Sequence, residues 1–304
     1  MREFLYKVVF FTLPLLLLLI LVEFLIQFYP NTFNAKASFL NKNKDVELLF
    51  LGSSHTQNAI NPEYISMKSA NLAYGNQDYT LDSALFFTNA KKLKSLKCIF
   101  LEVDYHSLES VRDSDYFRNS WYYRFYGISV FEVKLLQKVC LYSSSPEFFN
   151  EYYYKTFITK EFAYDMNQYG FIKNVIPSRF HGLKFDVDKI NATYKDPGIE
   201  NSKEKFNYNK RKILSIINYC NQNLIKVVLL KLPVFESFSN NYILSKNKRR
   251  LDLIDSLSRS ENVLVLDYEK DNRFNVYDFK DDDHLCSSGA KKLSLILNKE
   301  IKNW

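Results

Sequence analysis

Five short, mostly apolar runs recur along the chain, separated by longer segments of mixed polarity. We interpret them as β-strands because four of them are rich in leucine and β-branched residues and stop at glycine, proline or polar side chains, while Ser69–Ala73 is more polar. They cover Val46–Leu51, Ser69–Ala73, Cys98–Val103, Lys226–Leu232 and Asn262–Leu266. Amphipathic helical patterns lie between them, and a last helix is expected to begin near Ser287 or Ser288. Apolar strands that alternate with helices indicate an α/β fold whose parallel sheet is covered on both faces.

The segment from Val8 to Tyr29 is almost wholly apolar and is interrupted only by Glu23 and Gln27. At about 1.5 Å per residue, a helix of this length spans a bilayer core of roughly 30 Å. A cleaved signal peptide is the alternative, with an A-x-A site at residues 35–37. However, the apolar run is longer than that of a signal peptide, and the site lies well beyond its end. We therefore predict that residues 1–30 are an uncleaved membrane anchor.

Arg2 and Lys7 precede the apolar run, which favours a cytoplasmic N-terminus. The predicted location is a bacterial cytoplasmic membrane, crossed once, with the rest of the chain in the periplasm or on the outer face. Residues 31–45 are polar without clear periodicity, so we predict a tether there. Residues 46–304 are predicted to form the main domain. The aromatic-rich stretch 111–201 is predicted to be a mainly helical insertion that forms a cap or wall beside the site, with most of its aromatic rings in its own core.

Composition excludes several classes of function. Apolar residues make up 47% of the 304 residues, enough for a full core, and the net charge is +7. The basic residues are interspersed with acids and form no stripe, so no nucleic-acid partner is predicted. The four cysteines include no C-x-x-C pair, and His55, His106 and His181 lack ligand spacing with acidic residues along the sequence. Neither a metal nor a cofactor is predicted.

A serine and an Asp-His pair follow two of the predicted strands. Ser54 comes directly after the first strand, and Asp281 and His284 follow the fifth. The carboxyl ends of parallel strands meet at one edge of a sheet, so these residues can share a site. A serine hydroxyl is a weak nucleophile until a base takes its proton, and the base needs a carboxylate to hold its tautomer. Asp282 and Asp283 compete with Asp281 for that role. A turn serine and a solvated acidic loop are the structural alternatives.

Taken in order, these segments resemble the blocks of the SGNH, or GDSL-like, hydrolase superfamily. The first block corresponds to Gly52–Thr56 (GSSHT) and the last to Asp281–Leu285 (DDDHL). Asn71–Gly75 (NLAYG) resembles the second block, and Val227–Val234 (VVLLKLPV) resembles the strand before the last block. The resemblance covers roughly residues 46–110 and 205–300. It implies a flavodoxin-like three-layer sandwich with a five-stranded parallel sheet.

The resemblance also implies site residues. Ser54 would be the nucleophile, His284 the base and Asp281 the acid that orients the base, while Ser53 stands at the aspartate position of the Gly-Asp-Ser motif. The backbone N–H groups of Ser54 and Ala73 would form the oxyanion hole.

Two positions depart from the family pattern. Ala73 replaces the usual glycine of the second block, although a backbone N–H survives this change. The third block usually supplies an asparagine side chain as another oxyanion donor, but the segment Leu101–Ser107 (LEVDYHS) contains none. Tyr105 or His106 could donate instead, although His106 could equally be a packed loop residue. Loss of one such donor typically costs on the order of 10²–10³ in turnover.

With its leading apolar helix, the chain is similar to extracytoplasmic SGNH-like proteins that act on cell-surface polymers, such as polysaccharide O-acetyl esterases and acetyltransferases and the D-alanyl transfer protein of teichoic acid synthesis. This implies a serine esterase or O-acyltransferase that acts on acyl esters, acetyl esters first of all, of cell-surface glycans. The implied partners are the acylated glycan, the membrane and a multi-span membrane acyltransferase. The alternative is a catalytically inactive SGNH-fold protein that binds glycan or acts as a scaffold in surface-polymer assembly.

Overall fold

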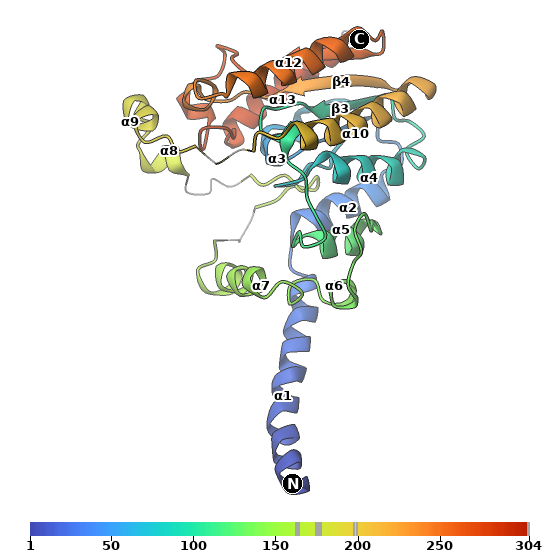
Figure 1. Ribbon diagram of the computed structural model, residues 1–304, viewed down its shortest axis with the longest axis vertical. Helices are drawn as coiled ribbons and strands as arrows, with labels where there is room; N and C mark the ends of the chain where they lie inside the picture. Colours follow the sequence, from blue (N-terminus) through green and yellow to red (C-terminus); the bar gives the residue numbers. More distant parts are fainter. Residues whose placement is uncertain (162–164, 174–177, 197, 199, 303–304) are drawn as a thin grey trace. The chain divides into compact units, whose positions relative to one another are not determined.

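The chain folds into two compact units, shown in a computed structural model that describes residues 1–161, 165–173, 178–196, 198 and 200–302 (Figure 1). The first unit comprises Met1–Asn31 and Ser114–Tyr164. The second comprises Thr32–Asp113 and Asp165–Trp304. The predicted insertion 111–201 is thus divided, because its second part belongs to the same unit as the sheet.

Helix α1 (Arg2–Gln27) dominates the first unit and is long and apolar enough to be a candidate membrane span. Its apolar side chains are exposed over most of its length, but Glu23 near its end is buried. The Glu23 carboxylate accepts hydrogen bonds from the backbone N–H groups of Leu141, Tyr142 and Ser143 and from the Ser143 hydroxyl. The acid that interrupts the apolar run is therefore stabilised by a turn of its own unit.

Short helices and aromatic residues complete the first unit. The helices are α5 (Asn119–Tyr126), α6 (Leu135–Val139), α7 (Pro146–Tyr153) and the π-helical turn η3 (Tyr154–Ile158). The rings of Trp121 and Tyr142 lie 5.1 Å apart and those of Tyr142 and Tyr152 lie 4.5 Å apart, and all three residues are buried. These aromatic residues form a core of their own, as aromatic rings commonly do.

A five-stranded parallel sheet organises the second unit. Its strands are β1 (Leu48–Leu51), β2 (Ser69–Asn71), β3 (Cys98–Glu102), β4 (Lys226–Lys231) and β5 (Val263–Asp267). Their order is β2-β1-β3-β4-β5, the flavodoxin-like arrangement. In the register, Phe50 lies beside Phe100 and Phe100 beside Val228. The predicted fold class and all five predicted strands are confirmed.

Helices cover both faces of this sheet (Figure 1). Helices α3 (Ser54–Ala59) and α13 (Ser287–Ile301) lie on one face, where Leu293 and Leu297 pack in one core cluster with Phe50 and Phe100. Helices α4 (Tyr79–Ala90) and α10 (Lys203–Gln222) lie together on the other face. Helix α12 (Leu244–Ser258) packs beside β5. The remaining short helices are η1 (Pro62–Tyr64), η2 (Ser107–Glu109), α8 (Arg179–Gly182), α9 (Val187–Ala192), α11 (Glu236–Ser239) and η4 (Val276–Asp278).

The segment predicted to be an irregular tether contains a helix instead, α2 (Thr32–Lys42). Phe33, Ala37 and Leu40 are buried at helical spacing, so a short apolar face was hidden among polar residues. Lys36 is buried on this helix, and its Nζ donates to the Ala73 carbonyl oxygen at 2.6 Å. Burial lowers the pKa of Lys36 to about 7. This helix therefore belongs to the packed unit and supports the chain just after β2.

Candidate active site

The turn after β1 brings Ser53 and Ser54 to the carboxyl edge of the sheet. Gly52 has a φ of +147°, and a Cβ there would lie 2.6 Å from atoms of the Glu102 and Thr56 side chains. Only glycine tolerates both this backbone conformation and this close approach. Ser53 then caps α3, its Oγ accepting a hydrogen bond from the His55 N–H, and Ser54 is the first residue of the helix.

Ser54, His284 and Asp281 lie in hydrogen-bonded sequence, as the sequence motifs predict for a catalytic triad. Ser54 Oγ lies 2.8 Å from His284 Nε2, and His284 Nδ1 lies 2.9 Å from Asp281 Oδ1. The same Asp281 oxygen accepts the backbone N–H of His284 at 2.8 Å. Burial lowers the pKa of His284, but the carboxylates of Asp281 and Asp283 outweigh this effect and raise that pKa overall. Such an arrangement lets His284 accept the Ser54 proton and hold it.

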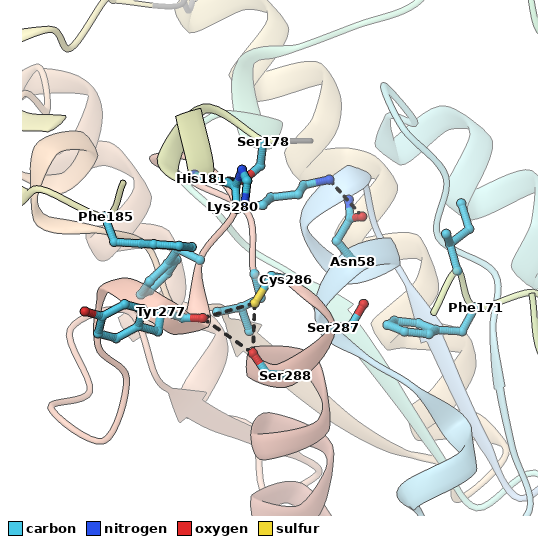
Figure 2. A pocket seen from close by; sticks show the side chains of 13 residues that line it. Asn58, Phe171, Ser178, His181, Phe185, Tyr277, Lys280, Cys286, Ser287 and Ser288 are labelled. Atoms are coloured by element: carbon cyan, nitrogen blue, oxygen red, sulfur yellow. Dashed lines mark hydrogen bonds between the residues drawn. The ribbon is translucent and has the colours of Figure 1, made fainter. Parts of the chain in front are cut away.

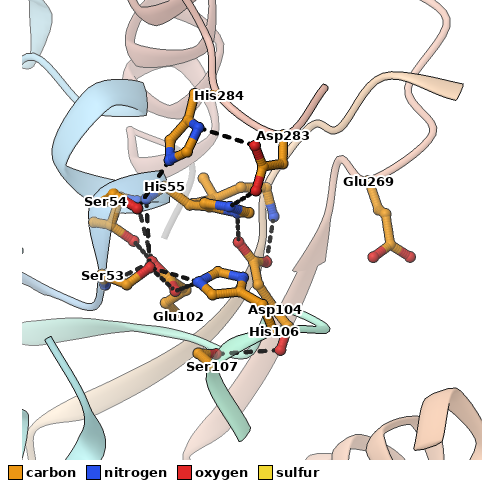
Figure 3. Close-up of polar contacts among 12 residues, drawn as sticks. Ser53, Ser54, His55, Glu102, Asp104, His106, Ser107, Glu269, Asp283 and His284 are labelled. Carbon is orange, nitrogen blue, oxygen red and sulfur yellow. Dashed lines mark hydrogen bonds and ion pairs between the residues drawn. The ribbon is translucent and has the colours of Figure 1, made fainter. Parts of the chain in front are cut away.

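Asp283 is a second carboxylate on the same imidazole (Figure 3). Its Oδ1 lies 3.0 Å from His284 Nδ1, and its Oδ2 lies 3.0 Å from Nε2 of His55. Burial acts to raise the pKa of Asp283, but His284 and His55 hold it well below its usual value. The other nitrogen of His55, Nδ1, lies 2.8 Å from Asp104 Oδ2. Burial raises the pKa of Asp104 to about 6, so this carboxyl is largely ionised at neutral pH.

Glu102, at the end of β3, stabilises the turn that contains Ser53 and Ser54. This fully buried carboxylate accepts hydrogen bonds from the backbone N–H and hydroxyl of Ser53, at 2.9 and 2.6 Å, and from the backbone N–H and hydroxyl of Thr56, at 3.1 and 2.7 Å. Four donors on one buried carboxylate fix the turn rigidly, because each would be costly to leave unpaired. Glu102 thus positions the turn that carries Ser54.

His106 and Tyr105 do not supply the missing oxyanion donor in this structure. The Ser53 hydroxyl donates its hydrogen bond to Glu102, so its oxygen can only accept from His106 Nε2–H, 2.9 Å away. Burial and the positive charge of His55 hold the pKa of His106 well below its usual value, which leaves Nδ1 without a proton. The Tyr105 hydroxyl accepts the N–H of Ile243 at 2.8 Å. Asp104 and His106 therefore contact His55 and Ser53, respectively, whereas the Tyr105 ring lies 4.6 Å from the Lys246 ammonium of α12.

The two backbone N–H groups predicted to bind the oxyanion, those of Ser54 and Ala73, differ in whether they already make a hydrogen bond. The Ala73 N–H donates to the Asn71 side-chain oxygen at 3.0 Å and is therefore already engaged. The Asn71 amide in turn donates to the carbonyl oxygens of Thr56 and Ile60, which ties β2 to α3. Within the described ranges, the N–H of Ser54 makes no hydrogen bond to the protein. Of the two predicted oxyanion donors, the Ser54 N–H is therefore the one that is available to a ligand.

The loop that carries His284 is anchored by Asp282. Arg179 Nη1 donates to both oxygens of this carboxylate, at 2.7 and 2.6 Å, and Ser237 also donates to it. The N–H of Phe235 donates to the Asp282 carbonyl oxygen at 2.9 Å. Helices α8 and α11 therefore fix the loop from outside, leaving Asp281 and Asp283 to face His284.

Among the residues that the structure describes, two groups of side chains have the composition of a metal site. They are His55 with Asp104 and His106, and His55 with Asp283 and His284, each with nitrogen and oxygen atoms within 4.8 Å of one another. The fold brings together residues that lack ligand spacing in the sequence, because neighbouring strands end side by side. Both nitrogens of His55 are engaged with carboxylates in this arrangement. We therefore assign these atoms to a hydrogen-bond network.

A cavity of about 400 Å³ lies beside the start of α13 (Figure 2). Asn58 and Lys280 line it, and none of the predicted triad residues does. The Lys280 ammonium donates to the Asn58 amide oxygen at 3.1 Å, and the Asn58 amide donates to the Ser54 carbonyl oxygen at 2.6 Å. One short chain of hydrogen bonds thus links this cavity wall to the serine turn.

The sequence motifs did not indicate His55, Glu102 and Asp104 as members of the site, and they offered Asp283 only as an alternative to Asp281. Their signal was their position: each lies at, or within a few residues of, the carboxyl end of a strand or in the loop that carries His284. Charged residues at such ends are candidates for a site because ligands bind there in open α/β sheets. The sequence alone does not say which of them meet.

No protein-family profile and no curated protein matches this chain. Among solved structures, it is similar to a GDSL-like lipase from Bacteroides thetaiotaomicron, at 12% identity and a TM-score of 0.41 over 90% of this chain and 100% of that one. It is also similar to a protein from Bacteroides fragilis provisionally named an acylhydrolase, at 14% identity and a TM-score of 0.39 over 85% and 88% of the two chains. At these TM-scores, we base the functional assignment on the site geometry alone.

Proposed function

We propose that this chain is a membrane-anchored serine esterase or O-acyltransferase that acts on acyl esters of cell-surface glycans, acetyl esters in the first instance. The observation that carries the proposal is the contact of Ser54 Oγ with His284 Nε2 at 2.8 Å, with Asp281 Oδ1 2.9 Å from the opposite ring nitrogen. Nucleophile, base and orienting acid are the three parts that acyl transfer through serine requires.

The chemistry proceeds in two halves. Ser54 Oγ attacks the ester carbonyl carbon while its proton passes to His284 Nε2, and the oxyanion accepts a hydrogen bond from the Ser54 N–H. Collapse of this intermediate breaks the ester bond, and the leaving sugar oxygen takes the proton from His284 and becomes a free hydroxyl. Water or a second sugar hydroxyl then attacks acyl-Ser54, again through His284, and frees the serine. The choice between these acceptors separates an esterase from a transferase.

The membrane and glycan parts of the proposal have separate support. Helix α1 qualifies as a membrane span by length and composition, and the basic residues Arg2 and Lys7 before its apolar stretch favour a cytoplasmic N-terminus. A single span would then put the sheet-containing unit outside the cytoplasm, where surface polymers are found. A multi-span membrane acyltransferase would be the source of activated acyl groups in the transferase version.

Surface glycans should change in acyl content when Ser54 is lost. We expect cells that carry Ser54→Ala to differ from parent cells in ester-linked acetate on purified surface polysaccharide, with more acetate if the enzyme is an esterase and less if it is a transferase. Alkaline release of acetate followed by chromatography measures this content. Cells that carry Ser53→Ala at equal protein level are the control for the serine turn. Identical acetate in Ser54→Ala and parent cells would contradict the glycan-ester proposal.

A catalytically inactive glycan-binding or scaffold protein is the second candidate. The observation that favours it is the sparse oxyanion hole, because the Ala73 N–H already donates to Asn71 and residues 101–107 contain no asparagine. This candidate predicts that Ser54→Ala leaves both glycan binding and surface acylation unchanged. The acetate content of Ser54→Ala cells distinguishes the two candidates, and sedimentation of the full-length protein with isolated surface polysaccharide tests the glycan binding that the second one requires.

A further inference from the structure

His55 is held between two carboxylates that come from different loops (Figure 3). Its Nδ1 lies 2.8 Å from Asp104 Oδ2, its Nε2 lies 3.0 Å from Asp283 Oδ2, and its side chain is only 1% exposed. An ionised carboxylate can only accept hydrogen bonds, so each ring nitrogen must carry a proton. His55 is therefore an imidazolium cation enclosed in the protein.

The cation is connected to the proposed catalytic residues through Asp283. One oxygen of Asp283 contacts His55, and the other lies 3.0 Å from His284 Nδ1. On the far side, Asp104 Oδ1 accepts the N–H of Leu232 at 3.1 Å, just beyond the end of β4. A continuous path of hydrogen bonds thus runs from the sheet edge through Asp104, His55 and Asp283 to His284 and Ser54.

The positive charge of His55 counteracts the effect of two carboxylates on the pKa of His284. Asp281 and Asp283 both contact Nδ1 of His284, and each stabilises its protonated form. A general base that stays protonated at neutral pH cannot accept the serine proton. The ring of His55 lies 4.8 Å from that of His284, and its positive charge offsets one of the two negative charges.

We propose that His55 is a positioning residue for the Ser54–His284 pair: its cationic ring fixes Asp283 against His284 and balances the charge of that carboxylate. This inference rests on the proposed function, because it assigns His55 a part in keeping His284 available as a base. Asp104 is the outer support of the same ring.

Among the described residues, the loop that carries His284 brings Asp281, Asp283 and Lys280 close to the two imidazoles, and Lys280 interacts electrostatically with both carboxylates. The segment at the end of β3 contributes Glu102, Asp104 and His106, while α11 presents the apolar Phe238. Tyr194 and Lys246 interact electrostatically with Asp283 and His106, respectively. The His106 ring lies 3.9 Å from that of His55, and its lowered pKa keeps it neutral where His284 titrates. Both His55 and His106 could be protonated at acidic pH, but only His55 is already positively charged at neutral pH.

The test is the pH dependence of covalent labelling of the full-length protein in detergent by a fluorophosphonate. Labelling requires neutral His284, so its rate falls on the acid side. His55→Gln removes a positive charge near His284, and this raises the pKa of His284. We therefore expect the acid limb, the part of the pH profile in which the labelling rate falls as His284 becomes protonated, to move up by about one pH unit. At a pH on that limb the rate then falls about tenfold, while the rate on the alkaline plateau changes less than threefold. Asp283→Asn removes a negative charge, and its acid limb is expected to move down.

Opposite shifts from two neighbouring residues are a signature that simple structural damage does not produce. The exposed His181 provides the matched control, because His181→Gln makes the same chemical change on α8 and should leave the limb in place. NMR of ¹⁵N-histidine-labelled wild type adds a measurement without mutation at the site. We expect one imidazole ring to keep both protons at pH 8, and its signal to be absent from His55→Gln.

The experiment distinguishes failure of the proposed function from failure of the proposed role of His55. If wild type is not labelled, or Ser54→Ala is labelled as fast as wild type, the proposed function fails and the role of His55 falls with it. If Ser54-dependent labelling is normal but the limbs of His55→Gln and Asp283→Asn stay in place or move together, only the role of His55 is overturned. Titration of all four histidines to the neutral form by pH 8 would overturn it as well, even if His55→Gln does not fold.

Discussion

Replacing Ser54 with alanine is expected to lower kcat for hydrolysis of a small aryl acetate by about 10⁴- to 10⁶-fold, because Ser54 Oγ is the hydroxyl that contacts His284 Nε2. Ser53→Ala is the matched control on the same turn. Ser53 is buried and its hydroxyl contacts Glu102 and His106 rather than His284, so its loss should loosen the turn and cost far less, about tenfold. Steady-state kinetics of the two purified full-length variants measure the difference. Equal losses in both would contradict the assignment of Ser54 as nucleophile.

The second large effect is expected when both carboxylates on His284 are removed. In a triad with one acid, conversion of that acid to its amide costs about 10⁴ in kcat because the histidine takes the wrong tautomer. Here Asp281 Oδ1 and Asp283 Oδ1 lie 2.9 and 3.0 Å from the same nitrogen. We therefore expect Asp281→Asn alone to cost only about 10²-fold, Asp283→Asn to cost about tenfold or less, and the double variant to cost the full 10⁴-fold.

The asymmetry between the two single variants has a structural reason. Asp281 Oδ1 also accepts the backbone N–H of His284, so its loss disturbs the loop as well as the ring. Kinetics of both single variants and the double variant at one pH form a double-mutant cycle. Additive losses would contradict the view that the two carboxylates substitute for each other on His284.

The sequence was sufficient to predict the sheet, because its apolar runs are short, separated by helices and bounded by clear stop signals. It also indicated the pairing of Ser54 with His284, because both follow strands that must end at the same edge. It was insufficient for α2, whose apolar face is only Phe33, Ala37 and Leu40 within a polar segment. Three apolar residues in one short helix give too weak a periodic signal without the sheet against which they pack.

The acidic run shows why the site could be predicted only in part. Asp281, Asp282 and Asp283 are chemically identical, yet the fold gives each a different main partner: His284, Arg179 and His55, respectively. Those partners depend on the register of β1 and β3 and on a helix that precedes the loop by about a hundred residues. Neither the strand register nor the position of that helix can be read from the sequence pattern. The hydrogen bond from the Ala73 N–H to Asn71 could not be predicted from the pattern either.

The central claim is that Ser54 is a nucleophile activated by His284. The most direct test is to react the full-length protein with a fluorophosphonate, digest it and locate the adduct by mass spectrometry. We expect one phosphonylated residue, Ser54, and no adduct in the Ser54→Ala or His284→Ala variants under the same conditions. An adduct on Ser53, an adduct that persists without His284, or no adduct on the folded wild-type protein would contradict it.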